Sequence, residues 1–352
     1  MSIFTAPSYD DHELVTFGKD ERTGLRAIIA VHSTTMGPAV GGCRMYPYAS
    51  EEAALDDVLR LSRGMTYKSA LAGLPFGGGK SVIIGDPRAD KTPDLMRAMG
   101  DFIHSQGGRY VAAEDSGTGV EDIRLMAERT SHVSGLDDNE FGGDPSPSTA
   151  RGVFLAIRAS VRHRLGQEST RGIRVALQGL GHVGFYLAKF LVEDGAEVVA
   201  TDVAEANLAR AVEQLGVTAV APDSIISWEA DVFAPCAMGA ILNRESIGQL
   251  RAGIVAGAAN NQLATPADGD SLKERGILYC PDFLINAGGI IDVHHQRLGS
   301  AEAEKREHIR RIETNLAEVL RRADESHRQT NAIAEEMAED ILRQAPGGAL
   351  AA

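Results

Sequence analysis

Cysteine is scarce in this chain of 352 residues, which contains only Cys43, Cys236 and Cys280. The three are far apart, and no two of them form a CxxC pair. Their number and spacing argue against a disulfide framework and against a cysteine-based zinc site, and they indicate reduced thiols. The chain also lacks any apolar run near the length of about 20 residues that a membrane-spanning helix needs.

Basic residues are outnumbered, with 35 Lys and Arg against 49 Asp and Glu, which gives a net charge of −14. This charge opposes binding to nucleic acid or to an anionic membrane. The segment Met1–Thr5 has no basic region followed by an apolar run, so we expect no signal peptide and a cytoplasmic protein. A chain of 352 residues exceeds the usual limit of a single core, which predicts two domains.

The most distinctive segment that is present runs from Gly64 to Ser81 and holds Lys68 and Lys80 among apolar and glycine residues. Lysine normally keeps its ammonium group in water, so this setting is unusual. Three glycines precede Lys80 and a short apolar strand follows it, which predicts a glycine turn and a partly buried lysine. Such a lysine can act as a base near neutral pH. The alternative is a structural turn whose lysines both face solvent.

The rest of the first part indicates a mixed α/β domain. We expect strands at 25–31 and 109–113, a helix capped by Ser50 that is directly followed by the two-lysine segment, and a glycine-rich loop at 37–42. Asp115 follows the second of these strands and is a catalytic candidate, because α/β folds bind ligands where strands end. The alternative for Asp115 is a turn-forming residue.

A linker is expected at 142–149, where two prolines and two glycines interrupt regular structure. A helix from 150 to 164 would then open the second domain. The resulting division is 1–143 and 144–326, with two amphipathic helices between 301 and 345. Residues 346–348 should end the last helix.

The second domain carries the pattern Gly179-x-Gly181-x-x-Gly184 between a predicted strand and a predicted helix. Glycines in this setting allow a tight turn and the approach of a pyrophosphate to the helix N-terminus. Asp202 ends the next strand, about 20 residues on, where the acid that binds the ribose belongs. It would repel a 2′-phosphate, so the pattern predicts a Rossmann domain that prefers NAD to NADP. A glycine turn in an unrelated α/β unit is the alternative.

A pair of asparagines and a pair of histidines occur in the second part of the chain. Further strands are expected at 231–237, 253–259 and 277–282, and Asn260 and Asn261 end the second of them. The segments 277–282 and 286–289 are expected to close the sheet. His294 and His295 are adjacent, so on a regular element they point in different directions and predict no metal site.

The segment Lys68-x-Ala-x-Ala-Gly-Leu-x-x-Gly-Gly-Gly-Lys80 resembles the active-site signature of the Glu/Leu/Phe/Val amino acid dehydrogenases, and its leucine dehydrogenase-like branch most. The resemblance implies that Lys68 binds the substrate carboxylate and that Lys80 activates water as general base. It also implies that Asp115 exchanges a proton with the substrate amino group. The substrate-binding and oligomerisation domain would come first and the Rossmann domain second, with a cleft between them and a C-terminal helix of about 327–352 packed on the first domain.

The same resemblance implies further contacts, although Ser116 and Asp292 depart from the residues that relatives commonly carry. Implied substrate-binding residues are Val40, Gly41, Gly42, Ala113, Asn261, Ile290 and Val293. Implied cofactor-binding residues, besides the three glycines and Asp202, are Thr149, His182, Val183, Cys236, Ala237, Ala259, Asn260 and Asn286.

These features together predict a homo-oligomeric enzyme that deaminates an apolar L-amino acid with NAD. The uncharged pocket residues favour leucine, isoleucine or valine, and a phenylalanine or tryptophan dehydrogenase is the first alternative. A non-catalytic NAD-binding sensor on the same fold is the second. A phosphate-binding NTPase is the third, because Gly79-Lys80-Ser81 resembles the end of a P-loop, although Leu74 stands where its first glycine belongs.

Overall fold

We analysed a computed structural model of the chain, which describes residues 3–136, 143–237 and 239–345. The contacts divide the chain into two compact units. The first comprises Met1–Gly143 and Ala338–Ala352, and the second comprises Asp144–Met337. Within the described residues, no helix combines the length and the apolar character needed to cross a bilayer.

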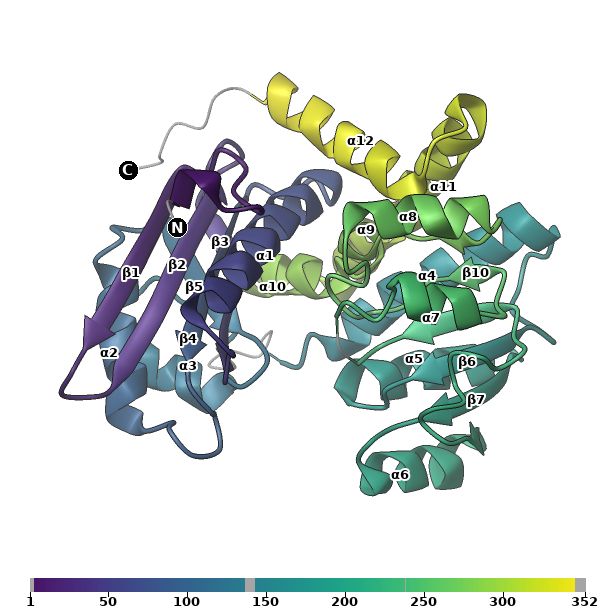
Figure 1. The fold of residues 1–352 in the computed structure, drawn as a ribbon, viewed down its shortest axis with the longest axis horizontal. Helices are drawn as coiled ribbons and strands as arrows, with labels where there is room; N and C mark the ends of the chain where they lie inside the picture. Colours follow the sequence, from purple (N-terminus) through teal and green to yellow (C-terminus); the bar gives the residue numbers. More distant parts are fainter. Residues whose placement is uncertain (1–2, 137–142, 238, 346–352) are drawn as a thin grey trace. The chain divides into compact units, whose positions relative to one another are not determined.

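The first unit is built on a five-stranded sheet of order β1-β2-β4-β3-β5 (Figure 1). β3 pairs in parallel with β4 and β5, whereas β2 pairs antiparallel with β1 and β4. The elements are β1 (Leu14–Asp20), β2 (Leu25–Ser33), β3 (Ala39–Tyr46), α1 (Glu51–Leu71), β4 (Gly77–Ile84), α2 (Pro93–His104), β5 (Tyr110–Glu114) and α3 (Val120–Ala127), after a short 3-10 turn at Ile3–Thr5.

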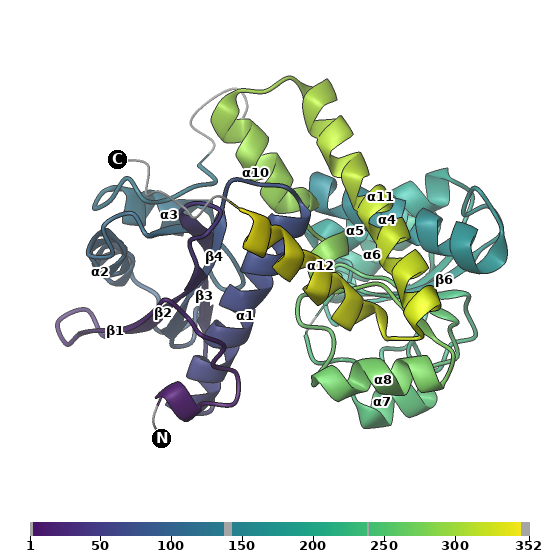
Figure 2. The same cartoon turned by 90° about the horizontal axis from the view of Figure 1, so that it is seen from above.

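Both faces of this sheet are covered, which explains why β2 is apolar from Ala27 to Val31. Alternate residues of β2 point to opposite faces. Ala27, Ile29 and Val31 pack with α2 and α3, whereas Ile28 and Ala30 pack with α1. Figure 2 shows α2 and α3 on one side of the strands and α1 on the other.

The second unit is a parallel six-stranded sheet of order β11-β10-β9-β6-β7-β8, as expected for a doubly wound fold. Helices α7 and α8 contribute to the core on one face. Its strands are β6 (Arg174–Gln178), β7 (Glu197–Thr201), β8 (Thr218–Ala219), β9 (Val232–Pro235), β10 (Ile254–Val255) and β11 (Leu278–Tyr279). Its helices are α4 (Ser146–Leu165), α5 (His182–Glu193), α6 (Glu205–Leu215), α7 (Arg244–Gln249), α8 (Pro266–Glu274), α9 (Asp282–Ile285), α10 (Gly288–Leu298) and α11 (Glu302–Ser326).

The last helix, α12 (Thr330–Gln344), spans the division between the two units. Its residues from Ala338 belong to the first unit, where Tyr67 donates a hydrogen bond to Glu339 at 3.3 Å. The two amphipathic helices expected between 301 and 345 are α11 and α12. The expected helix stop at 346–348 lies outside the described residues.

Candidate active site and dinucleotide-binding loop

Lys80 lies within strand β4, and its three preceding glycines belong to the same strand. The expectation of a glycine turn was therefore wrong. These residues are glycines because neighbouring elements come too close for side chains. A Cβ added to Gly78 would lie 2.1 Å from the backbone nitrogen of Thr66 in α1, and one on Gly79 would lie 2.7 Å from the ring of Tyr110. The strand setting also rules out a P-loop, which needs this lysine on a loop that leads into a helix.

Lys68 lies in the last turn of α1, which runs without a break from Glu51 to Leu71. The sequence predicted that the lysine segment would follow this helix, so that boundary was wrong, and Gly64 is accommodated inside the helix. Lys68 is half-buried, and α1 packs closely on β4. A cation in the last turn of a helix is stabilised by the helix dipole.

Asp115 follows β5 and forms a buried ion pair with Lys80, whose side chain is only 5% exposed. The carboxylate also accepts a hydrogen bond from the backbone N–H of Ser116 at 2.5 Å. The structure therefore brings together the two predicted catalytic side chains, which are 35 residues apart in the chain. Gly42 makes this possible, because a Cβ there would lie 2.7 Å from the Asp115 Cβ.

Arg44 is a third charged group at this pair, and the sequence analysis missed it. Its Nε and Nη2 atoms each lie 3.4 Å from Asp115 Oδ1, and its Nη1 donates to Asp57 at 3.0 Å. Tyr48 donates to the same Asp57 oxygen at 2.6 Å. A single arginine inside the otherwise uncharged strand β3 was the only local signal.

The charges of this cluster decide the protonation state of Asp115. Burial alone would raise its pKa, but the nearby cations Lys80 and Arg44 outweigh burial and hold the pKa of Asp115 well below its usual range. Burial opposes the charged form of Arg44, yet Asp115 and Asp57 raise its pKa further. The cluster thus keeps a carboxylate ionised in a setting that is nearly closed to water.

The predicted side-chain pocket of the first unit lies on β3 and β5. Gly41 and Gly42 belong to β3, so the loop expected at 37–42 was wrong from Ala39 onward. Val40 pairs with Val111, and Gly42 pairs with Ala113, so Val40 and Ala113 share one face of the sheet. Val40 is 2% exposed, and Ala113 is half-buried.

The glycine loop of the second unit joins β6 to α5, in the predicted strand-turn-helix setting. Gly179 has a φ of +95°, and a Cβ on Gly184 would lie 1.9 Å from the Gly179 carbonyl oxygen. Gly181 caps α5, and a Cβ there would meet no atom within 4 Å. His182 and Val183 form the first turn of α5. The loop is therefore tight at its base and open at the helix N-terminus, as a bound pyrophosphate requires.

Asp202 follows β7 directly, as predicted. Its carboxylate accepts hydrogen bonds from the backbone N–H groups of Leu180 at 2.6 Å and Ala204 at 2.7 Å. Asp202 therefore holds the glycine loop in place, a role that the sequence did not predict. Each carboxylate oxygen has a second lone pair, so both can still accept from ribose hydroxyls.

Cys236 and Ala237 follow β9 and pack against the glycine loop, since a Cβ on Gly179 would lie 2.9 Å from the Ala237 Cβ. Ala259 is buried in the loop after β10. The three cysteines are free thiols, and burial raises the pKa of each to about 12.

The predicted asparagines cluster where β10 and α9 end. Asn286 donates to Asn260 Oδ1 at 2.8 Å and to the Ala258 carbonyl at 3.1 Å. Among the residues that the structure describes, the buried Oδ1 of Asn286 has no hydrogen-bond donor. Asn261 has a φ of +51°, which is uncommon outside glycine. Asn286 follows α9 and does not close the sheet, contrary to expectation.

Thr149 lies in the first turn of α4, which begins at Ser146 and not at the predicted residue 150. Pro147 fits there because the first turn of a helix needs no backbone N–H from it. Ser148 donates to Asp292 at 2.5 Å, and Lys305 donates to the same carboxylate at 3.1 Å. This chain of contacts ties the start of α4 to α10.

Ile290 and Val293 lie on α10, both half-buried, and His294 and His295 follow on the same helix. His295 lies 3.0 Å from a ring nitrogen of His308. Despite this proximity, no group of three or more potential metal ligands is found in the described part of the chain.

The sequence matches two family models along most of its length. Residues 13–132 match the dimerisation domain of Glu/Leu/Phe/Val dehydrogenases, and residues 144–210 and 201–344 match the glutamate/leucine/phenylalanine/valine dehydrogenase model.

Individual relatives agree with this match. The chain is 46% identical over 344 residues to a leucine dehydrogenase of Geobacillus stearothermophilus, and the alignment covers 97% of this chain and 94% of that relative. It is 45% identical over 339 residues to a phenylalanine dehydrogenase of Bacillus thermotolerans, at 95% and 89% coverage. The solved L-tryptophan dehydrogenase of Nostoc punctiforme is similar with a TM-score of 0.79 at 41% identity, covering 95% of this chain and 96% of that one. The chain therefore belongs to the Glu/Leu/Phe/Val dehydrogenase family.

Proposed function

We propose that this dehydrogenase catalyses the reversible, NAD-dependent oxidative deamination of an apolar L-amino acid to its 2-oxo acid and ammonia. The observation that carries the proposal is the buried Lys80–Asp115 pair, with Arg44 beside it, at the centre of the first unit's sheet. An ionised carboxylate next to an amine can exchange protons with an amino group and with water. Lys68, in the last turn of α1, is the candidate partner of the substrate carboxylate.

The dinucleotide loop fits NAD. The loop is open at the N-terminus of α5, and Asp202 can accept from the ribose but would repel a 2′-phosphate. The unpartnered Oδ1 of Asn286 suits an N–H donor such as a carboxamide. When bound, the nicotinamide would accept a hydride from the substrate α-carbon.

The residues of the first unit would carry the proton steps. Lys80 donates to Asp115, and a substrate ammonium beside that carboxylate would donate to it as well. As general base, Lys80 would accept a proton from water as the water oxygen bonds to the iminium carbon of the oxidised substrate. Asp115 would accept a proton from the substrate ammonium before the α-carbon is oxidised and return it to the nitrogen of the carbinolamine. The C–N bond then breaks, the C=O bond forms, and the hydroxyl proton leaves with the ammonia as ammonium.

We propose leucine, isoleucine or valine as preferred substrates. Val40 and Ala113 are uncharged, so the second carboxylate of glutamate would be buried without a partner, which is costly. Ala113 beside a β-branched residue also leaves less room for an aromatic ring than glycine would. Sequence identity alone does not decide between an aliphatic and an aromatic substrate, since leucine and phenylalanine dehydrogenases are similar to the chain to nearly the same degree.

The test is NADH formation with a panel of L-amino acids. We expect the highest kcat/KM with a branched aliphatic substrate, and a clear preference for phenylalanine or tryptophan would overturn the pocket assignment but not the reaction class. Absence of NADH formation with every L-amino acid would refute the reaction and favour an NAD-binding sensor.

We also propose a homo-oligomer, because the first unit matches a model described as a dimerisation domain. Light scattering coupled to size-exclusion chromatography would give the mass, and a mass of 37.4 kDa, that of one chain, would contradict this proposal.

A further inference from the structure

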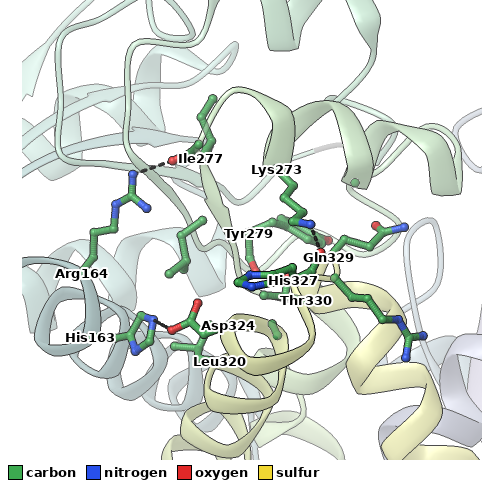
Figure 3. Close-up of a pocket in the computed structure, with 15 residues that line it drawn as sticks. His163, Arg164, Lys273, Ile277, Tyr279, Leu320, Asp324, His327, Gln329 and Thr330 are labelled. Atoms are coloured by element: carbon green, nitrogen blue, oxygen red, sulfur yellow. Dashed lines mark hydrogen bonds and ion pairs between the residues drawn. The ribbon is translucent and has the colours of Figure 1, made fainter.

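Polar side chains that the proposed reaction does not use occur in both units. In the second unit, Figure 3 shows a cavity of about 410 Å³ that is lined by several of them. His163 pairs there with Asp324 at 3.2 Å, and Lys273 donates to the His327 carbonyl, so contacts within the protein account for their orientation without a ligand. In the first unit, by contrast, the unused side chain of Thr118 is in direct contact with the catalytic candidate Asp115.

Asp115 is the first residue of a four-residue turn that follows β5. The backbone N–H of Thr118 donates to the Asp115 carbonyl at 2.9 Å, and Gly117, the third residue, has a φ of +82°. A positive φ at this position is typical of a type II turn and favours glycine. The turn lies directly against β3, because a Cβ on Gly117 would be 2.1 Å from the Met45 carbonyl oxygen. The backbone path that leads out of Asp115 is therefore closely fixed.

The hydroxyl group of Thr118 bridges this turn to β3. It accepts a hydrogen bond from the backbone N–H of Asp115 at 3.1 Å and donates to the Cys43 carbonyl at 2.6 Å. The Asp115 carbonyl, at 3.3 Å, is a more distant acceptor for the same hydroxyl proton. Cys43 and Glu114 are the last pair of the ladder between β3 and β5. The hydroxyl thus extends the link between these strands by one residue, to the backbone of Asp115.

This bridge acts on the candidate catalytic carboxylate through the backbone. The Asp115 side chain is 11% exposed and pairs with Lys80, so a rotation of its backbone would carry the carboxylate away from that partner. Loss of the Thr118 hydroxyl would remove one partner from the Asp115 N–H and one from the Cys43 carbonyl, and buried backbone groups are nearly always paired. A misplacement of 1 Å can cost about 10²-fold in rate, so a smaller shift remains measurable.

Contacts that do not involve the hydroxyl hold the same turn. Lys91 donates to the Gly117 carbonyl at 3.1 Å and to Asp122 at 2.8 Å, and Asp122 accepts from the Gly119 N–H at 2.9 Å. The turn should therefore keep its fold when the hydroxyl of Thr118 is removed. A substitution of Thr118 then tests the position of Asp115 and not the folding of the first unit.

We propose that Thr118 is a positioning residue, whose hydroxyl fixes the backbone of Asp115 and so places its carboxylate against Lys80 for proton exchange. This role rests on the proposed deamination, in which Asp115 accepts a proton and returns it. Thr118 acts through Asp115 and transfers no proton itself.

The test compares Thr118→Val, which removes the hydroxyl and keeps the shape, with Thr118→Ser, which keeps the hydroxyl. Both full-length variants are assayed with the L-amino acid that gives the unsubstituted enzyme its highest kcat/KM. The stoichiometry of NADH binding corrects kcat for any unfolded fraction. We expect Thr118→Val to lower kcat by about tenfold with the Kd for NADH unchanged, because Asp115 is displaced while the dinucleotide loop is intact. Thr118→Ser should keep most of the kcat.

Thr23→Val is the matched control. Thr23 lies three residues after Asp20, as Thr118 does after Asp115, and its hydroxyl donates to Asp20 at 2.8 Å in the turn between β1 and β2. Its substitution removes a turn hydroxyl of the same unit that does not contact Asp115, and it should leave kcat unchanged.

Three results would overturn the role of Thr118: a Thr118→Val enzyme with the kcat of the unsubstituted enzyme, a Thr118→Ser enzyme as slow as Thr118→Val, or an equal loss with Thr23→Val. Thr118→Ala also lacks the hydroxyl and decides the outcome if Thr118→Val does not fold. An unsubstituted enzyme that forms no NADH with any L-amino acid would refute the proposed reaction, and this role with it.

Discussion

The two candidate sites of this protein are built in opposite ways. In the first unit, four charged side chains from separate segments form one network, which runs from Lys80 through Asp115 and Arg44 to Asp57. In the second unit, the dinucleotide loop is made of glycines and backbone N–H groups, and Asp202 is its main charged contact. Charged side chains set the protonation states of the groups around them, whereas a loop of glycines and backbone N–H groups sets which ligand shape fits. Substitutions in the two units should therefore damage different kinetic parameters.

Lys80→Ala should have the largest effect. Loss of a general base typically lowers the rate by about 10²–10⁴-fold, and we expect a fall in kcat of that size with the Kd for NADH unchanged. Stopped-flow turnover and fluorescence titration with NADH would measure the two quantities. Lys19→Ala removes an exposed lysine of the same unit and should leave both unchanged. A Lys80→Ala enzyme with near-normal kcat would end the assignment of Lys80 as the base.

Paired glycine substitutions test the comparison directly. Gly42→Ala would push a methyl group against Asp115 and should lower kcat by about 10²-fold through misplacement of that carboxylate, without a change in NADH affinity. Gly184→Ala would place a methyl group against the Gly179 carbonyl oxygen. Overpacking of this kind costs about 1–3 kcal/mol, and we expect the distorted loop to bind NADH roughly tenfold more weakly.

Gly64→Ala is the control for both, since a Cβ there meets no atom within 4 Å. If Gly42→Ala altered NADH affinity and not kcat, the separation of roles between the two units would be wrong.

Arg44→Gln should change the pH dependence of the reaction. Arg44 stabilises the anionic form of Asp115, so its removal raises the pKa of that carboxyl group toward the usual range. Asp115 would then become protonated at a higher pH, and kcat/KM should begin to fall at a higher pH on the acidic side of the profile than in the unsubstituted enzyme. Arg97→Gln removes an exposed arginine of the same unit as control. An unshifted acidic limb would show that Arg44 does not act on Asp115.

Asp202→Ser should have the smallest effect. Removal of the carboxylate relieves repulsion of a 2′-phosphate, and we expect the ratio of kcat/KM for NAD over NADP to fall by about tenfold, or about 1.4 kcal/mol. Because Asp202 also anchors Leu180, part of the change should be a loss of NAD affinity. Equal use of both cofactors by the unsubstituted enzyme would refute the proposed preference.

The same contrast explains what the sequence could predict. The glycine loop and the strand Glu197–Thr201 depend on residues close in the chain, and their predicted positions agree with the structure. The Arg44–Asp115 contact joins residues 71 positions apart, and the predicted sheet did not specify which strands are neighbours. No local pattern marked Arg44, Asp57 or Tyr48 as partners.

Glycine and proline were misjudged for a related reason. Gly77–Gly79 and Ser146–Thr149 were expected to break regular structure, because these residues usually do so when considered alone. Close packing of α1 on β4 requires glycine within a strand, and the first turn of a helix accepts proline. Both outcomes depend on what surrounds the residue and not on its own preference.

The high pKa of the three thiols has a practical consequence for biophysical work. A thiol must ionise to react with a maleimide or a methanethiosulfonate, and a pKa near 12 leaves almost none of Cys43, Cys236 and Cys280 in that form at neutral pH. We therefore expect the natural chain to react slowly and to give a low background in site-directed labelling. A cysteine placed at an exposed position such as Lys19 and another at Lys189 would carry a fluorophore pair or two spin labels, one on each unit. Distances between them, recorded with and without NADH and substrate, would test whether the two units move relative to one another, with no cysteine removed.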